Sequence, residues 1–299
     1  MTVTLIVALA LSVLIGVSLG LLGGGGSILT VPILTYVAGL PAKEAIAASL
    51  FVVGTTSLVS VVFHARRGRV KWRTGLVFGV ASMAGAFGGG LLGGHIPGTV
   101  LMIAFALMMV ATAAAMIRGR RKAPSSGGDE AKKLPVVKVI LEGLVVGLVT
   151  GLVGAGGGFL VVPALVLLGG LSMPAAVGTS LVVIAMKSFA GLGGYLTSVQ
   201  LDWGLVAGVT AAAIVGSLIG AKLTGIIPEN ILREGFGFFV LAMGVFVLVQ
   251  ELPSPASAIV GVLGSGAVAA VLLCRYAIPA CQMHRNRKQT DTPQPAPIG

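Results

Sequence analysis

Long apolar runs follow one another along almost the whole chain, and they limit the possible fold more than any other feature. Several approach the roughly 20 residues that a helix needs to cross the core of a bilayer. Only 10% of the 299 residues are charged and 56% are hydrophobic, whereas an average soluble domain has about 25% charged residues. This composition excludes a soluble globular fold and predicts an all-α polytopic membrane protein.

The two halves of the chain repeat each other at a constant offset of 131 residues. At this offset the glycine-rich stretch Gly20–Pro32 aligns with Gly151–Pro163, and the only two tryptophans, Trp72 and Trp203, align with each other. The chain is therefore interpreted as a tandem duplication with five apolar segments in each half. The predicted segments cover residues 4–22, 27–40, 44–63, 74–94 and 99–117 in the first half, and 136–153, 158–171, 175–197, 204–226 and 231–250 in the second.

The distribution of Lys and Arg predicts that the two repeats are inverted, because these residues favour cytoplasmic loops. The loop His64–Arg73 is strongly basic, whereas its repeat-related loop Tyr195–Gly204 has no Lys or Arg. The two loops therefore belong on opposite faces of the membrane. Five crossings in each half, an odd number, permit this inversion and place the N-terminus outside and the C-terminus in the cytoplasm.

The predicted organisation is a first membrane repeat over residues 1–120, a cytoplasmic linker over 121–133, a second membrane repeat over 134–252, an extra transmembrane helix over 256–274 and a disordered basic tail over 284–299. The net charge of +11 comes from loop cations that act as orientation signals, so no nucleic-acid partner is expected. Cys274 and Cys281 lie beside the tail, and we expect free thiols in the reducing cytoplasm.

A cluster of glycines precedes the short second segment of each half. About 14 residues at a rise of 1.5 Å reach roughly 21 Å, less than a hydrocarbon core of about 30 Å. One end of the segment must therefore lie inside the protein, where irregular backbone is tolerated if it is buried or lines a cavity. The N–H groups and the positive dipole end of a helix start favour an anion there. The residues expected to contact substrate are Gly25, Gly26 and Ser27 in the first half, and Gly156, Gly157 and Gly158 in the second. Alternatively, these glycines serve only close helix packing.

Lys187 lies near the middle of the predicted segment 175–197, too deep for its side chain to reach either surface. This depth predicts a role in binding an anionic substrate or in coupling. The alternatives are a structural cation bonded to the carbonyls of a broken helix and a neutral lysine. Hydroxyl-bearing residues near Lys187 and near the repeat-related position complete the predicted site: Ser49, Thr56, Ser57, Thr179, Ser180 and Ser188. A single Ser or Thr more often bonds a preceding helical carbonyl.

No pattern typical of an enzyme or of a metal site is found in the sequence. The histidines have no partner at metal-ligand spacing, and the glycine clusters lack the lysine of a nucleotide-binding loop. No carboxylate is predicted in the middle of the membrane, which weakens an interpretation as a cation transporter. We therefore expect no catalytic residue, no metal and no cofactor.

Three features together resemble the sulfite exporter TauE/SafE family of membrane transporters over about residues 10–250: the two glycine-rich runs that end in proline, the stretch Gly178-Thr-Ser-Leu181, and Ser188. The resemblance implies a cofactor-free secondary transporter, built from inverted repeats, for anions such as sulfite, thiosulfate or organosulfonates. In the first half the stretch is Ala47-Ala-Ser-Leu50, so the pattern is not fully symmetric.

These observations predict a secondary transporter in a prokaryotic inner membrane that moves a small anion by alternating access, with one inverted half rocking against the other. The expected partners are the anion and the lipid bilayer. A proton or a sodium ion as coupling ion, and a homo-oligomer, stay open. A passive anion channel and a non-transporting membrane scaffold are the alternatives. Saturable counterflow distinguishes a carrier from a channel, and paired glycine breaks have no use in a scaffold.

Overall fold

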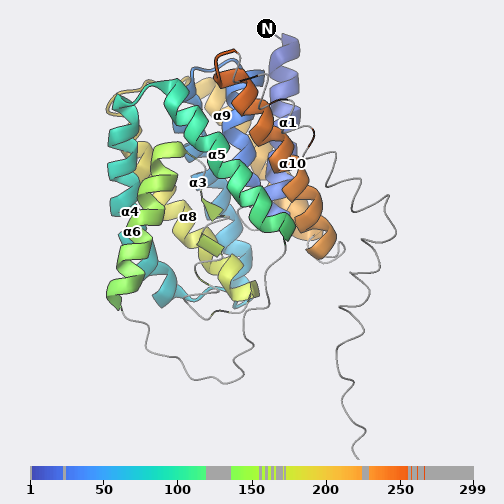
Figure 1. Ribbon diagram of the computed structural model, residues 1–299. Helices are drawn as coiled ribbons and strands as arrows, with labels where there is room; N and C mark the ends of the chain where they lie inside the picture. Colours follow the sequence, from blue (N-terminus) through green and yellow to red (C-terminus); the bar gives the residue numbers. More distant parts are fainter. Residues whose placement is uncertain are drawn as a thin grey trace, which may run out of the picture.

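The computed structural model describes residues 2–22, 25–118, 136–154, 157–158, 161–162, 165, 171, 173–223, 229–254, 257, 261 and 266. Within these residues the chain forms helices joined by short turns, with no strand (Figure 1). The predicted linker, the predicted tail, Gly156 and both cysteines lie outside the described residues. Of the predicted extra helix, only Ser257, Gly261 and Gly266 are described.

The helices agree with the predicted apolar segments to within three residues at either end, except for the predicted segment 158–171, most of which lies outside the described residues. Those of the first half are α1 (Thr2–Leu22), α3 (Ala42–Arg66), α4 (Trp72–His95) and α5 (Gly98–Arg118), and those of the second are α6 (Val136–Val153), α8 (Met173–Tyr195), α9 (Trp203–Leu223) and α10 (Glu229–Glu251). Between α1 and α3 the chain forms a short broken helix of three parts: η1 (Gly25–Leu29), α2 (Thr30–Pro32) and the π-helix η2 (Ile33–Val37).

The turn from α3 to α4 shows how sequence sets a helix end. Gly68 has a φ of 65°, the left-handed conformation that glycine adopts without strain. Its N–H donates to the Ala65 carbonyl at 3.0 Å, and the Arg69 N–H donates to the His64 carbonyl at 3.1 Å. These two bonds form a Schellman motif, which ends α3 and exposes the basic residues that follow.

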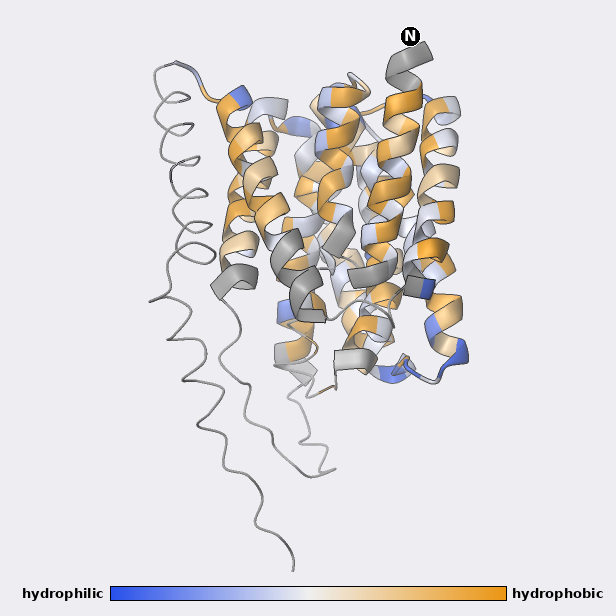
Figure 2. Ribbon diagram, turned by 90° about the vertical axis from the view of Figure 1, so that its right-hand side faces the viewer, coloured by the Kyte–Doolittle hydropathy of each residue, from blue (hydrophilic) through white to orange (hydrophobic). Residues whose placement is uncertain are grey.

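Four described helices are long and apolar enough to cross a membrane: Ala42–Arg66, Trp72–His95, Ala175–Tyr195 and Trp203–Gly220. Hydrophobic residues cover the sides of the bundle and hydrophilic residues gather at its ends (Figure 2). Large apolar side chains such as Ile6, Val80 and Leu141 are more than 60% exposed. Contiguous apolar surface of this kind is unfavourable in water and suits lipid, so the chain is a multi-pass membrane protein.

The most extensive helix contacts join the two halves of the chain. Helix α1 packs along α9, α4 packs along α6 and α8, α5 packs along α10, and α3 crosses α8. The contacts recur at the 131-residue offset: a Cβ at Gly85 would overlap the Leu144 carbonyl, and a Cβ at Gly216 would overlap the Val13 carbonyl. The most extensive helix contacts thus lie between the halves and not within them.

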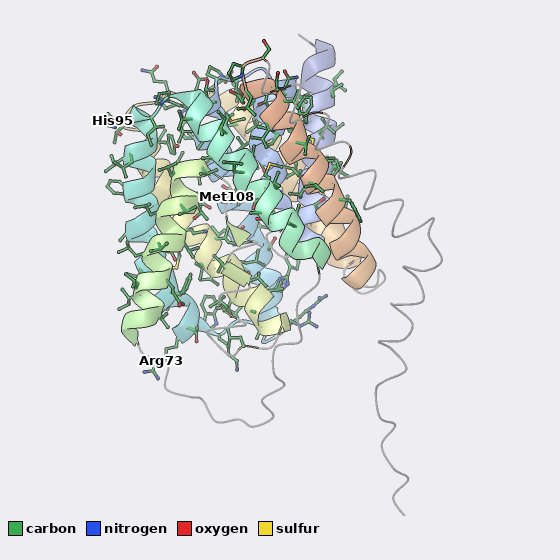
Figure 3. The ribbon with its side chains drawn as sticks, viewed as in Figure 1. Arg73, His95 and Met108 are labelled. Atoms are coloured by element: carbon green, nitrogen blue, oxygen red, sulfur yellow. The ribbon has the colours of Figure 1, made fainter. Side chains whose placement is uncertain are left out.

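Repeat-related turns lie at opposite ends of the bundle. The turn between α3 and α4 contacts the start of α8, where the Arg69 backbone lies against Gly178. The turn between α8 and α9 contacts the end of α4, where Ser198 lies against Gly94. Figure 3 accordingly shows Arg73, at the start of α4, and His95, at its end, on opposite sides of the molecule.

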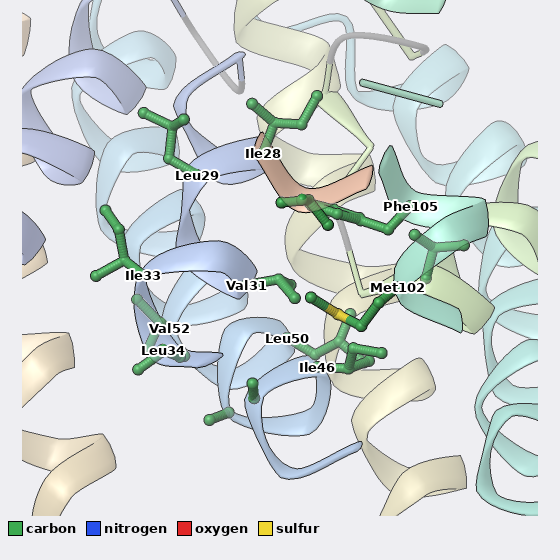
Figure 4. Packing of buried hydrophobic residues seen from close by; sticks show 14 of the residues in the cluster. Ile28, Leu29, Val31, Ile33, Leu34, Ile46, Leu50, Val52, Met102 and Phe105 are labelled. Carbon is green, nitrogen blue, oxygen red and sulfur yellow. The ribbon is translucent and has the colours of Figure 1, made fainter. Parts of the chain in front are cut away.

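The broken helix between α1 and α3 lies in the hydrophobic core. Ile28, Val31 and Leu34 are fully buried and pack with Leu50 of α3 and Phe105 of α5 (Figure 4). This hydrophobic cluster buries the apolar side chains of the broken helix, which covers only residues 25–37. From Ser27 to Leu34 every residue of this segment is buried inside the protein.

Candidate functional site

The site is centred on Lys187, in the middle of α8. Its side chain is 1% exposed, and its Nζ donates a hydrogen bond to Thr150 Oγ1 at 2.8 Å. It makes no other hydrogen bond and no ion pair with any described residue. A buried cation without a countercharge is costly to the fold. A bound anion would supply the missing charge.

Thr150 of α6 is a site residue that the sequence analysis missed. Its side chain is 1% exposed, and its hydroxyl donates to the Val146 carbonyl at 2.7 Å. Because the hydroxyl proton is used there, the oxygen presents a lone pair to Lys187. One signal could have found it, since a hydroxyl residue stands directly before the second glycine-rich run where the first repeat has Leu19.

Gly157, in the second glycine cluster, lies against this pair. Gly157 has a φ of 60°, and a Cβ there would overlap both Lys187 Nζ and Thr150 Cγ2. Its carbonyl accepts from the Val161 N–H at 3.0 Å, so it stands at the start of a helical turn. Gly158 follows it and is buried. Two predicted site elements, Gly157 and Lys187, are thus in contact.

The first half has no matching charged group. The positions 131 residues before Lys187 and Thr150 are Thr56 and Leu19. Both are fully buried, and the Thr56 hydroxyl donates to the Val52 carbonyl of its own helix at 2.7 Å. Of the predicted glycine-loop residues, Gly25, Gly26 and Ser27 form η1, and Ser27 is buried. The arrangement around Lys187 therefore belongs to the second half alone.

Three of the predicted hydroxyl residues hold the backbone in place. Ser49 donates to the Gly154 carbonyl at 3.0 Å and so ties α3 to the second glycine cluster. Thr179 accepts from the Lys71 N–H at 3.0 Å and fastens the basic turn to the start of α8, about two helical turns from Lys187. Ser180 donates to the Val177 carbonyl at 2.8 Å.

Ser57 and Ser188 differ from these three. Both side chains are fully buried, both lack a hydrogen-bond partner among the described residues, and they occupy repeat-related positions. Ser188 lies where α8 meets α3, since a Cβ at Gly54 would stand 3.3 Å from Ser188 Cβ. A buried hydroxyl without a partner costs about 1 to 3 kcal/mol. An oxyanion bound beside such a hydroxyl would accept its hydrogen bond.

Within the part of the chain that the structure describes, no group of three His, Cys, Asp or Glu side chains is placed to hold a metal ion. Among the described residues, the polar groups that contact Lys187 Nζ are the Thr150 hydroxyl and the backbone of Gly157. Neither group is a carboxylate, the ligand that hard metal cations prefer.

Comparison with known proteins gives a match to a family described as sulfite exporter TauE/SafE over residues 8–247. A probable membrane transporter protein of Xylella fastidiosa strain 9a5c is 32% identical over 251 residues, which cover 82% of this chain and 95% of that protein. The probable membrane transporter protein MJ0441 of Methanocaldococcus jannaschii is 30% identical, over 80% of this chain and 95% of its own length. YdhB of Bacillus subtilis, with the same description, is 27% identical, over 79% and 96%. No solved structure matches significantly.

Proposed function

The chain belongs to the sulfite exporter TauE/SafE family, a family of membrane transporters, and from this premise we propose that it is a secondary transporter. Its substrate is a small sulfur-containing anion such as sulfite, thiosulfate or an organosulfonate, carried across the inner membrane by alternating access. The observation that carries this proposal is Lys187, a fully buried lysine with no anionic partner among the described residues.

The proposed anion site consists of the Lys187 ammonium, the backbone of Gly157 and Gly158, and the unpaired hydroxyls of Ser57 and Ser188. Sulfite, thiosulfate and sulfonates each present three oxygens that accept hydrogen bonds from such donors. The residues Gly25, Gly26 and Ser27 form the facing wall in this proposal, as repeat-related partners of the second glycine cluster. Ser49, Thr179 and Ser180 position the backbone around the site. Thr56 occupies the position of the first half that corresponds to Lys187 and carries no charge.

The burial of Lys187 supports a carrier over a passive channel. A channel needs a continuous aqueous path past its selective groups, whereas the Lys187 side chain is only 1% exposed. An anion reaches this cation only after helices move, which is the defining step of alternating access. A passive anion channel predicts large unitary currents instead, and electrical recording from planar bilayers separates the two.

We propose that the moving bodies are two swapped units, each made of helices from both halves. One unit comprises α1, α3 and α9, and the other comprises α4, α6 and α8. Extensive contacts lie within each unit, and the two units meet mainly where α3 crosses α8. Lys187 and Ser188 are on α8, so a shear at this crossing would open and close the anion site.

The proposed orientation is N-terminus outside and C-terminus cytoplasmic, with the repeats inverted. The exposed cations of the turn between α3 and α4, among them Arg67 and Arg69, favour the cytoplasmic side. In a chain with Cys274 and Cys281 replaced by serine, Gly68→Cys should react with a membrane-impermeant maleimide from the cytoplasm and Ser198→Cys from outside. Labelling of both from one side would contradict the inversion.

The test of the proposed function is a flux assay with the purified chain in proteoliposomes. Radiolabelled sulfite should show saturable uptake that is accelerated by sulfite on the opposite side. Competition with unlabelled thiosulfate, methanesulfonate, sulfate and acetate then ranks the substrates, and sulfur anions with three acceptor oxygens should compete best. Flux that does not saturate, or equal competition by acetate, would overturn the proposal.

A further inference from the structure

We propose that Thr150 is the positioning residue of the anion site, and that the chain binds one anion, at Lys187. Thr150 holds the Lys187 ammonium at a fixed place against the second glycine cluster. This inference rests on the proposed function, because it assigns the group that orients the cation of the same site.

The hydrogen bonds of Thr150 fix its direction. Its hydroxyl donates to the Val146 carbonyl one turn earlier in α6, at 2.7 Å, and accepts from Lys187 Nζ at 2.8 Å. A hydroxyl that donates to its own helix keeps a constant rotamer, so its acceptor lone pair keeps a constant direction. The lysine side chain is a flexible stem of four carbons, so it needs such an anchor to hold its charge in one place.

The ammonium retains donors for a ligand. A lysine Nζ carries three N–H donors, and Thr150 is the acceptor that the described residues provide. Two donors and the full charge therefore face the remaining surroundings of the site. A group with three oxygens on sulfur can accept both, and a charge-assisted bond is about twice as strong as a neutral one.

The glycine cluster confines the ammonium from a second direction. A side chain at position 157 would overlap Lys187 Nζ and Thr150 Cγ2, so the backbone itself covers the pair. Ser49 holds this cluster by its bond to the Gly154 carbonyl. Thr150 and Gly157 thus hold Lys187 Nζ from two directions.

The inference of a single site follows from the repeat. The equivalents of Thr150 and Lys187 are Leu19 and Thr56. Leu19 packs in an apolar cluster with Val53 and Leu181, and Thr56 bonds its own helix. A hydroxyl that pairs with a cation therefore occurs in only one of the two repeats. We therefore expect one anion to bind per chain.

The test compares Thr150→Val, which removes the acceptor at constant shape, with Thr150→Ser, which keeps it. In proteoliposomes, Thr150→Val should raise the KM for sulfite about 5- to 10-fold, the value of one hydrogen bond, with a smaller change in maximal rate. Thr150→Ser should stay within about twofold of wild type. Thr210→Val is the matched control, because Thr210 is also buried and bonds the carbonyl four residues earlier, but has no lysine partner.

A double-mutant cycle separates positioning from a structural role. Sulfite binding to detergent-purified protein is measured by calorimetry for wild type, Thr150→Val, Lys187→Met and the double variant. If Thr150 acts through Lys187, Thr150→Val should not weaken binding further in the Lys187→Met background. Equal weakening in both backgrounds, unchanged KM in Thr150→Val, or two bound anions per chain would overturn the inference.

The outcomes also distinguish this inference from the proposed function. A wild-type chain that neither binds nor transports any anion of the panel overturns both. A wild-type chain that transports sulfite normally while Thr150→Val behaves like Thr210→Val overturns the role of Thr150 alone. If Thr150→Val does not reach the membrane, Thr150→Ala and Thr150→Ser provide the same comparison. The alanine variant loses the hydroxyl that accepts from Lys187, and the serine variant keeps it.

Discussion

Burial of the Lys187 side chain costs the fold a large amount of free energy. No carboxylate among the described residues offsets this cost. Removal of a buried ion that has no countercharge relieves desolvation, whereas removal of one member of a buried ion pair leaves the other uncompensated. These two situations predict opposite effects on stability. Substitution of Lys187 therefore tests whether the cation serves the fold or the ligand.

We expect Lys187→Met to insert and purify like wild type and to lose sulfite flux by about 10- to 150-fold, the range given by a charge-assisted hydrogen bond of roughly 1.5 to 3 kcal/mol. Lys187→Arg should keep partial flux because it keeps the charge. The measurement is initial sulfite uptake per mole of reconstituted protein. Lys222→Met, at an exposed position on α9, is the control and should transport normally. Normal flux in Lys187→Met would assign the lysine a structural role.

Substitution of Gly157 can be compared with substitution of Gly68, a control glycine that has a similar backbone conformation. Gly157 and Gly68 have φ of 60° and 65°, so alanine strains both by a similar amount, of order 1 kcal/mol. A Cβ at Gly68 meets nothing within 4 Å, whereas a Cβ at Gly157 overlaps Lys187 Nζ. Gly157→Ala should therefore abolish sulfite uptake, and Gly68→Ala should preserve it at a similarly lowered melting temperature. Equal uptake by the two variants would mean that the second glycine cluster does not contact substrate.

Lys187 and Gly157 could be proposed as site residues from the sequence because depth in an apolar run and glycine clustering are visible in one dimension, and the structure brings the two into contact. Thr150 was missed because its importance depends on the rotation of α6 about its own axis, which brings it opposite α8. The same rotation places Thr179 at the basic turn and Ser49 against Gly154. Which hydroxyl groups face Lys187 therefore could not be predicted from how close they lie to it in the sequence.

Glycines within the helices permit close packing of the bundle, whereas a contact of Gly157 with substrate stays a prediction. Gly85 lets α4 approach α6 so closely that a Cβ would overlap the Leu144 carbonyl, and Gly216 does the same for α9 and α1. Small residues at such crossings allow close backbone contact, which is a main source of helix association in a membrane.

The packing role of these glycines predicts a clear contrast on α4. Gly85→Leu should separate α4 from α6 and destabilise the fold by about 1 to 3 kcal/mol, the usual cost of overpacking. Gly88, one turn away, would place its Cβ in open space, so Gly88→Leu should be tolerated. The measurement is the thermal melting point of detergent-purified protein followed by size-exclusion chromatography. Similar melting points for both variants would contradict close packing at Gly85.

Helix boundaries could be predicted to within three residues because polar breaks interrupt otherwise continuous apolar runs. Helix partners could not be predicted in this way. In a tandem duplication α1 has two sequence-equivalent choices, α4 in its own half and α9 in the other, and the same residue pattern fits both. The structure pairs α1 with α9 and α4 with α6. The choice depends on the orientation of each repeat in three dimensions and not on any local pattern.

At the scale of the whole molecule, this pairing decides which parts can move. A rigid motion of one sequence half against the other would break the α1–α9, α4–α6, α4–α8 and α5–α10 contacts together. A motion of the swapped units leaves α1–α9, α4–α6 and α4–α8 intact and shears mainly the crossing of α3 and α8. Transport by swapped units therefore disrupts far less packed surface.

Two cross-links distinguish these motions. Leu9 of α1 and Gly208 of α9 lie within one swapped unit, and a Cβ at Gly208 would stand 3.6 Å from Leu9 Cδ2. Phe51 of α3 and Phe189 of α8 lie in different units, with ring centroids 6.4 Å apart. In a chain without Cys274 and Cys281, each position is replaced by cysteine and each pair is joined with a short, reducible bis-thiosulfonate reagent.

The Leu9–Gly208 link should preserve sulfite uptake, because it joins helices that stay together. The Phe51–Phe189 link should stop uptake, and a reducing agent should restore it, because the link prevents the shear that exposes Lys187. Each cysteine pair before cross-linking is its own control for the substitutions. Arrest by the Leu9–Gly208 link with free transport through the Phe51–Phe189 link would instead indicate that the sequence halves move, at the cost of separating α1 from α9 in every transport cycle.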